Sequence, residues 1–184
     1  MNTFPSELCV LTELTSLSLK CTYVHTFPTQ FSNLASLTHL DLSFNSQVEL
    51  GQVSLALKPP CRINLVALHL NHLDMTQFPV EILTLTRLTT LECARNRFTS
   101  IPAGLSSLIM LQQLNLQGAY AHKSGSDLAL NLATSIYKLA DLRLLNLGCN
   151  FMGNLPPGIS RLSKLEMLSL CMNSLLRLPA GIEK

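Results

Sequence analysis

The sequence predicts an α/β solenoid, in which short parallel strands line a concave face and loops or short 3₁₀ or helical segments form the convex face. Three observations predict it. A Leu-x-x-Leu-x-Leu motif recurs along the chain, most copies are separated by the same interval, and an apolar-Pro pair follows most of them at a fixed distance. Such units cannot bury their leucines alone, so neighbouring units stack into one continuous core.

The motif occurs in seven copies with a preferred spacing of 23 residues. Successive copies are separated by 23, 28, 23, 23, 31 and 23 residues, and 20 of the 21 motif positions are leucine, the exception being Cys93. The two longer intervals contain insertions, which we place within 46–64 and 119–131. The copies begin at Leu14, Leu37, Leu65, Leu88, Leu111, Leu142 and Leu165.

These copies form a single array over residues 1–184, with a partial repeat at 1–13 and a truncated last repeat. Because stacked repeats need capping units with polar outer faces, we expect the isolated chain to self-associate through its uncapped ends. In the first insertion, apolar and polar residues alternate from Val48 to Leu57, which predicts a short strand on the convex side. The second insertion predicts an exposed turn.

Asparagine follows the last motif leucine by three residues in four of the copies. At this point the chain leaves the strand. A buried side-chain amide there offers two donors and one acceptor to backbone groups that would otherwise be buried unpaired. We therefore predict a structural asparagine ladder formed by Asn45, Asn96, Asn150 and Asn173.

The apolar-Pro pair lies five residues beyond the asparagine position, as in Ile101-Pro102. Proline fixes φ and lacks an amide hydrogen, so it ends any strand. Apolar side chains then recur at intervals of three residues, as at Leu105, Leu108 and Leu111. This spacing predicts a short 3₁₀ or helical segment that returns to the next strand.

The repeat resembles the leucine-rich repeat family. Its form, LxxLxLxxNxLxxLPxxIxxL in 23 residues, is similar to the short class found in intracellular Ras-suppressor, Scribble and plant Ras-group proteins, and the resemblance covers nearly the whole chain. The resemblance implies a right-handed horseshoe whose concave sheet binds other proteins, with no catalytic chemistry and no cofactor. It implies a small GTPase or a signalling complex as the partner.

Composition excludes several classes of function. The 184 residues include 41 leucines and 13 Lys and Arg against 11 Asp and Glu, a net charge of +2. This balance, without interleaved aromatic residues, argues against a nucleic-acid partner. No run of 18 apolar residues occurs and the N-terminus lacks a signal-peptide pattern, so we expect no membrane insertion. The six cysteines form no CxxC pair, and free thiols predict a cytoplasmic protein.

Residues that alternate with the motif leucines are expected to point out of the sheet and line its concave face. The residue between the last two motif leucines is polar in every copy: Ser18, Asp41, His69, Glu92, Asn115, Asn146 and Ser169. We expect the side chains of Asp41, His69, Glu92 and Asn115 to touch no core residue. The predicted partner-binding residues are His39, Asp41, His69, Asn71, Glu92, Arg95, Asn115, Gln117 and Asn146.

Two histidines and two carboxylates on adjacent strands, His39, Asp41, His69 and Glu92, are also candidate metal ligands. Parallel-strand neighbours lie in a row about 4.8 Å apart rather than at the corners of a tetrahedron, which favours a solvated binding face. No serine or cysteine nucleophile with an oxyanion-hole loop accompanies them. The sequence thus predicts no metal site, no cofactor and no enzyme.

Two further functions stay open. The chain is alternatively a ligand-sensing ectodomain fragment of a receptor, since the segment from Asn150 to Pro156 resembles the Gly-Pro segment of extracellular plant receptors. It is alternatively the regulatory segment of a larger enzyme such as a kinase or phosphatase. A second candidate surface is an apolar docking patch at the C-terminal end, formed by Leu144, Cys149, Met167, Cys171 and Met172.

Overall fold

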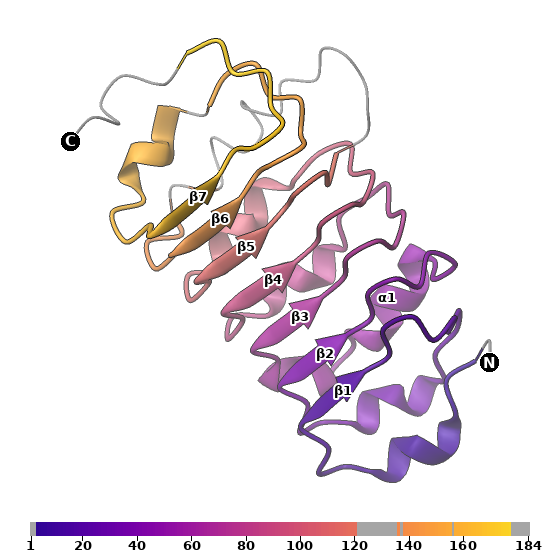
Figure 1. Ribbon diagram of the computed structural model, residues 1–184. Helices are drawn as coiled ribbons and strands as arrows, with labels where there is room; N and C mark the ends of the chain where they lie inside the picture. The colour runs from indigo at the N-terminus through magenta and orange to yellow at the C-terminus, as the bar shows by residue number, and fades with distance from the viewer. Residues whose placement is uncertain (1–2, 121–135, 137, 156, 178–184) are drawn as a thin grey trace.

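The predicted α/β solenoid is confirmed. A computed structural model describes residues 3–120, 136, 138–155 and 157–177. Within these ranges the chain forms one seven-stranded parallel sheet in which the strands follow one another in chain order (Figure 1). The strands are β1 (Ser16–Ser18), β2 (His39–Asp41), β3 (Ala67–His69), β4 (Thr90–Glu92), β5 (Gln113–Asn115), β6 (Leu144–Asn146) and β7 (Met167–Ser169).

The register aligns equivalent positions of the repeat across the whole sheet. Leu17 pairs with Leu40, Leu40 with Leu68, and the series continues to Leu168 on β7. Successive side chains of a strand point to opposite faces, so this central leucine faces the core while the residues beside it face outward. The leucine spacing therefore dictates which side chains line the concave face.

Short 3₁₀ helices return the chain on the convex side of the sheet (Figure 1). Each of the six described segments begins directly after a proline in the sequence, as η5 does after Pro102 with φ −68°. In η2, η4 and η5 the residue three positions after the proline is buried, as Leu105 is in η5, in accordance with the three-residue apolar spacing. The segments are η1 (Ser6–Val10), η2 (Thr29–Asn33), η3 (Cys61–Asn64), η4 (Val80–Thr84), η5 (Ala103–Ser107) and η6 (Pro157–Arg161).

The first insertion contains a helix, and the short strand predicted there is wrong. Helix α1 (Leu50–Ala56) buries Val53 and Ala56, and Leu57 directly after it is also buried. This spacing of three and four residues places the apolar side chains on one side of a helix, and the alternation within Val48 to Leu57 is incidental to it. Gln52 on this helix accepts a hydrogen bond from the Phe27 backbone N–H at 2.8 Å.

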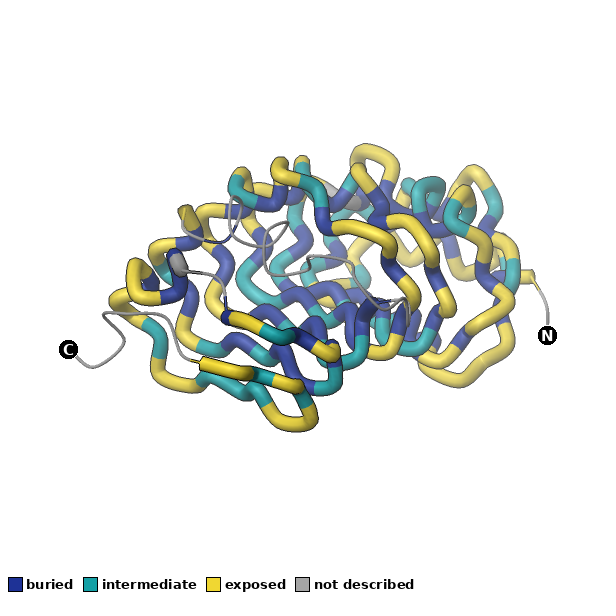
Figure 2. The backbone as a smooth tube through the Cα atoms, turned by 90° about the horizontal axis from the view of Figure 1, so that it is seen from above, coloured by how far each residue is buried: buried dark blue, intermediate teal, exposed yellow. Residues whose placement is uncertain are grey.

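The core runs without interruption from one end of the solenoid to the other (Figure 2). Motif leucines fill most of it, and Cys93 occupies the same kind of position with no exposed surface. Phe4, Phe27 and Phe31 pack together near the N-terminus with centroid distances of 4.8 to 6.2 Å. Most of the second insertion (121–131) and the predicted truncated end (178–184) lie outside the described residues.

No helix in the described part of the chain is long and apolar enough to cross a membrane.

Candidate functional site

The predicted concave column forms one aligned row on the outer face of the sheet. Asp41 pairs with His69, His69 with Glu92, Glu92 with Asn115, and Asn115 with Asn146. All five side chains are half-buried. His39 lies in the neighbouring column, where it pairs with Ala67, and its Nδ1 is 2.8 Å from the Thr38 hydroxyl. The structure therefore brings together five of the predicted binding residues, which we call the concave row.

Three residues of the concave row also hold the backbone. Asp41 Oδ1 accepts a hydrogen bond from the Ser43 N–H at 2.8 Å. Asn115 and Asn146 accept equivalent bonds, each at 3.0 Å, from the N–H two residues further along the chain. These three side chains therefore also stabilise the turns, because their carboxamide or carboxylate oxygens satisfy the first backbone groups after each strand.

Side chains also link neighbouring strands. Asn115 Nδ2 donates to Glu92 Oε2 at 2.7 Å, and Asn71 Oδ1 accepts from the Ala94 N–H at 2.7 Å. These bonds fix the orientation of Glu92 and Asn71 at the surface. His69 makes no hydrogen bond or ion pair with any described residue, so its imidazole is the free polar group at the centre of the row.

Among the described residues, no group of three or more His, Cys, Asp or Glu is placed to hold a metal ion.

The four predicted ladder asparagines bridge successive repeats. Asn96 Nδ2 donates to the Leu70 carbonyl of the previous repeat and to the Cys93 carbonyl of its own, both at 2.9 Å. Asn45, Asn150 and Asn173 make the same pair of bonds at 2.8 to 3.0 Å. Thr22, which takes the asparagine place in the first repeat, reaches only its own Leu19 carbonyl. The ladder keeps the strand ends, and hence the concave row, in register.

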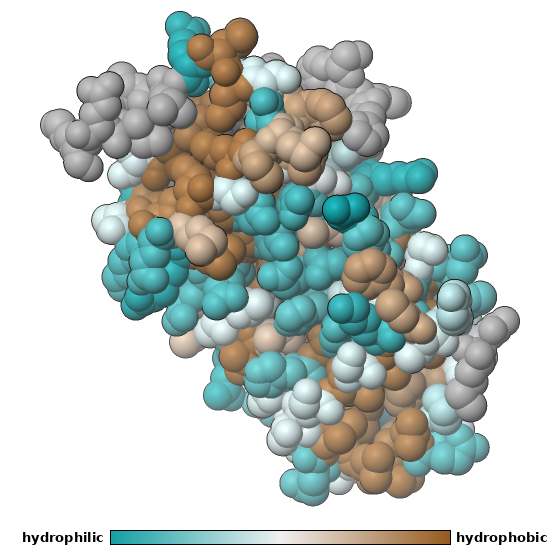
Figure 3. Space-filling view, viewed as in Figure 1, coloured by the Kyte–Doolittle hydropathy of each residue, from teal (hydrophilic) through white to brown (hydrophobic). Residues whose placement is uncertain are grey.

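The exposed surface becomes apolar toward β6 and β7. Met167 is 58% exposed and Met172 is 79% exposed, beside the exposed Cys171 and the half-buried Leu144. Figure 3 shows this change from the hydrophilic middle of the sheet to a hydrophobic area over the C-terminal strands.

A second line of side chains, which the sequence did not suggest, follows the carboxyl ends of the strands. In every repeat the residue two positions after the last motif leucine has a left-handed backbone, with φ between 52° and 62°. The N–H of each, except in the last repeat, donates to a carbonyl of the next repeat, as Arg95 does to Gln117 at 2.8 Å. We call this line the edge row: Cys21, Phe44, His72, Arg95, Gly118, Cys149 and Met172.

Neighbouring side chains of the edge row contact each other. The Phe44 and His72 rings stack at 4.3 Å with an interplanar angle of 18°, and Lys20 Nζ lies 5.2 Å from the Phe44 ring centroid. At the other end, the Cys149 thiol lies 3.7 Å from Met172 Sδ.

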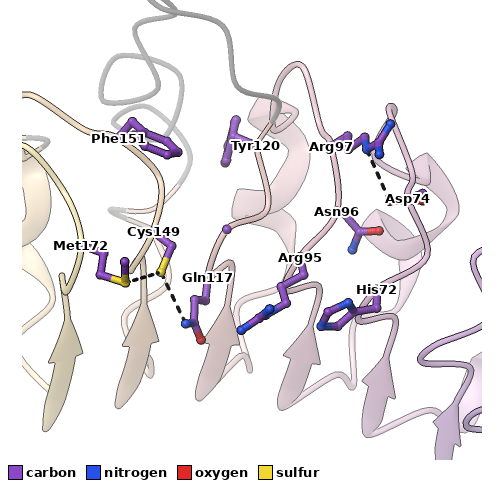
Figure 4. Close-up of a pocket in the computed structure, with 11 residues that line it drawn as sticks. His72, Asp74, Arg95, Asn96, Arg97, Gln117, Tyr120, Cys149, Phe151 and Met172 are labelled. Carbon is purple, nitrogen blue, oxygen red and sulfur yellow. Dashed lines mark hydrogen bonds and ion pairs between the residues drawn. The ribbon is translucent and has the colours of Figure 1, made fainter.

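A hollow of about 700 Å³ opens in the middle of the edge row (Figure 4). Its lining includes two predicted binding residues, Arg95 and Gln117, together with Cys149, Phe151 and Met172. Tyr120 also lines it, and its buried hydroxyl has no hydrogen-bond partner among the described residues. Burial raises the pKa of this phenol, which stays protonated.

Of the two arginines that line the amino-terminal side of the hollow, one forms an ion pair and the other does not. Arg97 forms an ion pair with Asp74 at 3.4 Å, whereas the Arg95 guanidinium makes no ion pair or hydrogen bond with any described residue. Partial burial and the positive charge of Arg95 lower the pKa of His72, against a smaller opposing effect of Asp74.

The basic residues before the strands are engaged on one flank of the solenoid. Lys164 pairs with Asp141, Arg143 pairs with Glu166, and Arg87 Nη1 donates to Asn64 Oδ1 at 3.0 Å. The hydrogen bond and charge of Lys164 lower the pKa of Asp141. These pairs are exposed and contribute little stability. They give a natural set of control positions away from the concave row.

Comparisons with known proteins agree with the fold. No family model matches the chain. Receptor like protein 23 of Arabidopsis thaliana is 37% identical over 91 residues, which cover 49% of this chain and 10% of that protein. A solved leucine-rich repeat protein of Leptospira interrogans is 28% identical with a TM-score of 0.59, over 97% of this chain and 54% of that one.

A plant peptide hormone receptor, RGFR1, solved in complex with RGF2, is 27% identical with a TM-score of 0.56. The match covers 95% of this chain and 27% of the receptor. The chain therefore spans only part of each of these proteins. Together the three similarities support the leucine-rich repeat family and point to a protein-interaction module, while the short intracellular class stays a prediction.

Proposed function

We propose that this leucine-rich repeat solenoid is a non-catalytic module that binds a protein partner on its concave face and serves in intracellular signalling. One observation carries the proposal: the concave row is a continuous, aligned line of polar side chains, and all of them except His69 are oriented by bonds to the backbone or to each other. Preorganised polar groups lose little entropy when a partner binds.

The dimensions of the sheet favour a protein over a small molecule. Seven strands at about 4.8 Å spacing span roughly 29 Å of open surface. Small ligands are usually bound in enclosed clefts that bury most of their surface. A surface of this length suits a protein partner, which buries a broad and mostly flat patch.

Intracellular placement is supported by the thiols. All six cysteines are free, and Cys9, Cys61 and Cys93 are buried as part of the core. Free thiols in this number are typical of reducing compartments such as the cytoplasm. A small GTPase or a signalling complex, which the sequence resemblance implies, is the first partner class that we would test.

A second candidate function is the ligand-sensing ectodomain fragment of a receptor. The similarity to Receptor like protein 23 and to RGFR1 favours it. It uses the same concave surface and differs from the first proposal in the compartment and in the kind of partner.

Affinity capture from cells tests the proposal. The wild-type chain would be compared with a concave variant, His69→Ala with Glu92→Gln, and with a flank variant, Arg87→Gln with Lys164→Gln. We expect the wild type and the flank variant to capture the same proteins, and we expect some of these to be missing from the capture with the concave variant. Protease protection of the full-length gene product then separates the intracellular proposal from the receptor.

A further inference from the structure

The edge row contains one gap, and the gap lies at the hollow. Six of its seven residues carry side chains, and only Gly118 has none. A Cβ atom at Gly118 would lie 3.9 Å from Arg95 Cγ and 3.8 Å from Cys149 Cβ, in ordinary contact with both. The gap is therefore flanked by Arg95 on one side and Cys149 on the other, and Figure 4 shows these two residues at the ends of β4 and β6.

The two sides of the gap differ in chemistry. On one side the exposed Arg95 guanidinium has no counter-ion within the described ranges, and its positive charge adds to the partial burial that lowers the pKa of His72. On the other side lie the Cys149 thiol, Phe151, which is 64% exposed, and Met172. Gln117 Nε2 lies 3.6 Å from the Cys149 sulfur and borders the gap toward the concave face.

We propose that the gap at Gly118 is a socket for one acidic side chain of a partner segment, with the carboxylate on Arg95 and the methylene groups against Cys149 and Met172. This inference rests on the proposed protein-binding function and extends it by naming the chemistry of the partner. Arginine binds carboxylates with two charge-assisted hydrogen bonds, and the sulfur-bearing wall accepts an apolar stem.

The spacing of the fold limits the socket to one side chain. Arg95 and Cys149 follow β4 and β6, so they are separated by two strand steps, or about 10 Å. An extended segment crossing the strand ends would insert one side chain there, and its neighbours would contact Phe151 on one side and the concave row on the other.

Two capped peptides test the proposal on the 184-residue chain. The probe is acetyl-Leu-Glu-Leu-Glu-Leu-amide, and its matched control replaces both glutamates by glutamine. In ¹H–¹⁵N spectra we expect the glutamate peptide to shift the Gly118 amide and the Arg95 Nε–H signals, and the glutamine peptide to bind about tenfold more weakly.

Substitutions at Gly118 and Arg95 separate the contribution of the gap to peptide binding from that of the Arg95 charge. Gly118→Met places in the gap a side chain that the row already carries at Met172, and it should weaken the glutamate peptide about tenfold. Gly118→Ala is the matched control, because it places a side chain on the same left-handed backbone as Gly118→Met but adds only a Cβ atom in ordinary contact. Its affinity for the glutamate peptide should stay within about twofold of wild type. Arg95→Gln should bind both peptides equally, and it tests the socket even if Gly118→Met does not fold.

Three results would overturn the socket: equal binding of both peptides by the wild-type chain, unchanged binding by Gly118→Met, or full displacement of the glutamate peptide by an equal concentration of inorganic phosphate. The last result indicates a general anion site. If a captured partner is lost with the His69 and Glu92 substitutions but still binds Gly118→Met, the socket is refuted and the proposed function is not. If the peptide binds the socket but the concave variant captures the same proteins as the wild type, the proposed function is refuted and the socket is not.

Discussion

The Asn96 side-chain amide donates a hydrogen bond to the Leu70 carbonyl across the boundary between two repeats, at 2.9 Å. Its Oδ1 also accepts from the Leu73 and Met75 N–H groups of the earlier repeat, at 3.3 and 3.2 Å. One buried residue thus pairs backbone groups on both sides of the boundary, which water cannot reach.

We expect Asn96→Ala to lower the free energy of unfolding by at least about 2 kcal/mol, because it leaves several buried backbone groups unpaired. Asn45→Ala should cost less, since Asn45 Oδ1 has no partner among the described residues. Urea unfolding followed by circular dichroism measures both. Gln112→Ala, which removes an exposed amide, is the control and should stay within about 0.5 kcal/mol of wild type. Equal losses in Asn96→Ala and Gln112→Ala would refute the structural role.

Thiol labelling should divide five of the six cysteines into two groups, with the half-buried Cys149 between them. Cys21 and Cys171 are exposed and should react within seconds at pH 8, while Cys9, Cys61 and Cys93 are buried and should react only as the chain opens. Burial raises the pKa of Cys61 to about 11, which further lowers its reactive thiolate fraction. Mass spectrometry of timed samples identifies each labelled site, and the unfolded chain provides the reference. Fast labelling of Cys61 or Cys93 would contradict the continuous core.

The titration of His72 should report the charge of Arg95. The pKa of His72 is lowered in the folded chain, so the unfolded chain binds this proton more readily and stability falls as the pH drops below the unfolded value of about 6.5. Arg95→Gln should raise the pKa of His72 and reduce this loss. NMR titration of the imidazole signals measures the shift. Arg87→Gln on the flank should leave it unchanged, and an unchanged His72 in Arg95→Gln would contradict the orientation of Arg95 toward His72.

The strands and their alignment were predictable because the leucine period alone determines which residue faces the core. The alternation of apolar and polar residues from Val48 to Leu57 led to the wrong prediction of a strand, since over a few residues a buried helical turn and a strand share similar apolar patterns. The edge row was not predictable from its residue types. Phe44, Arg95 and Met172 do not favour a left-handed backbone, and contacts between repeats, such as the Phe44 N–H bond to the Asn71 carbonyl at 2.8 Å, impose it.

The outward orientation of the concave row was predictable, but its hydrogen bonds to the backbone were not. The sequence indicates that Asp41 and Asn115 face outward, yet only the turn geometry shows that both accept backbone hydrogen bonds. Substituting them would disturb folding and binding together. His69, Glu92 and the exposed Gln113 are therefore the better probes of the surface.

The most direct test of concave binding is calorimetry with a purified partner obtained by capture. Here Gln113→Ala would be added to the concave variant, and the flank variant would again be Arg87→Gln with Lys164→Gln. With thermal unfolding within a few degrees of wild type for both, we expect the concave variant to lose at least about 1 kcal/mol of binding free energy and the flank variant to bind as wild type. Normal binding by the concave variant together with weakened binding by the flank variant would contradict the account and move the binding site off the sheet.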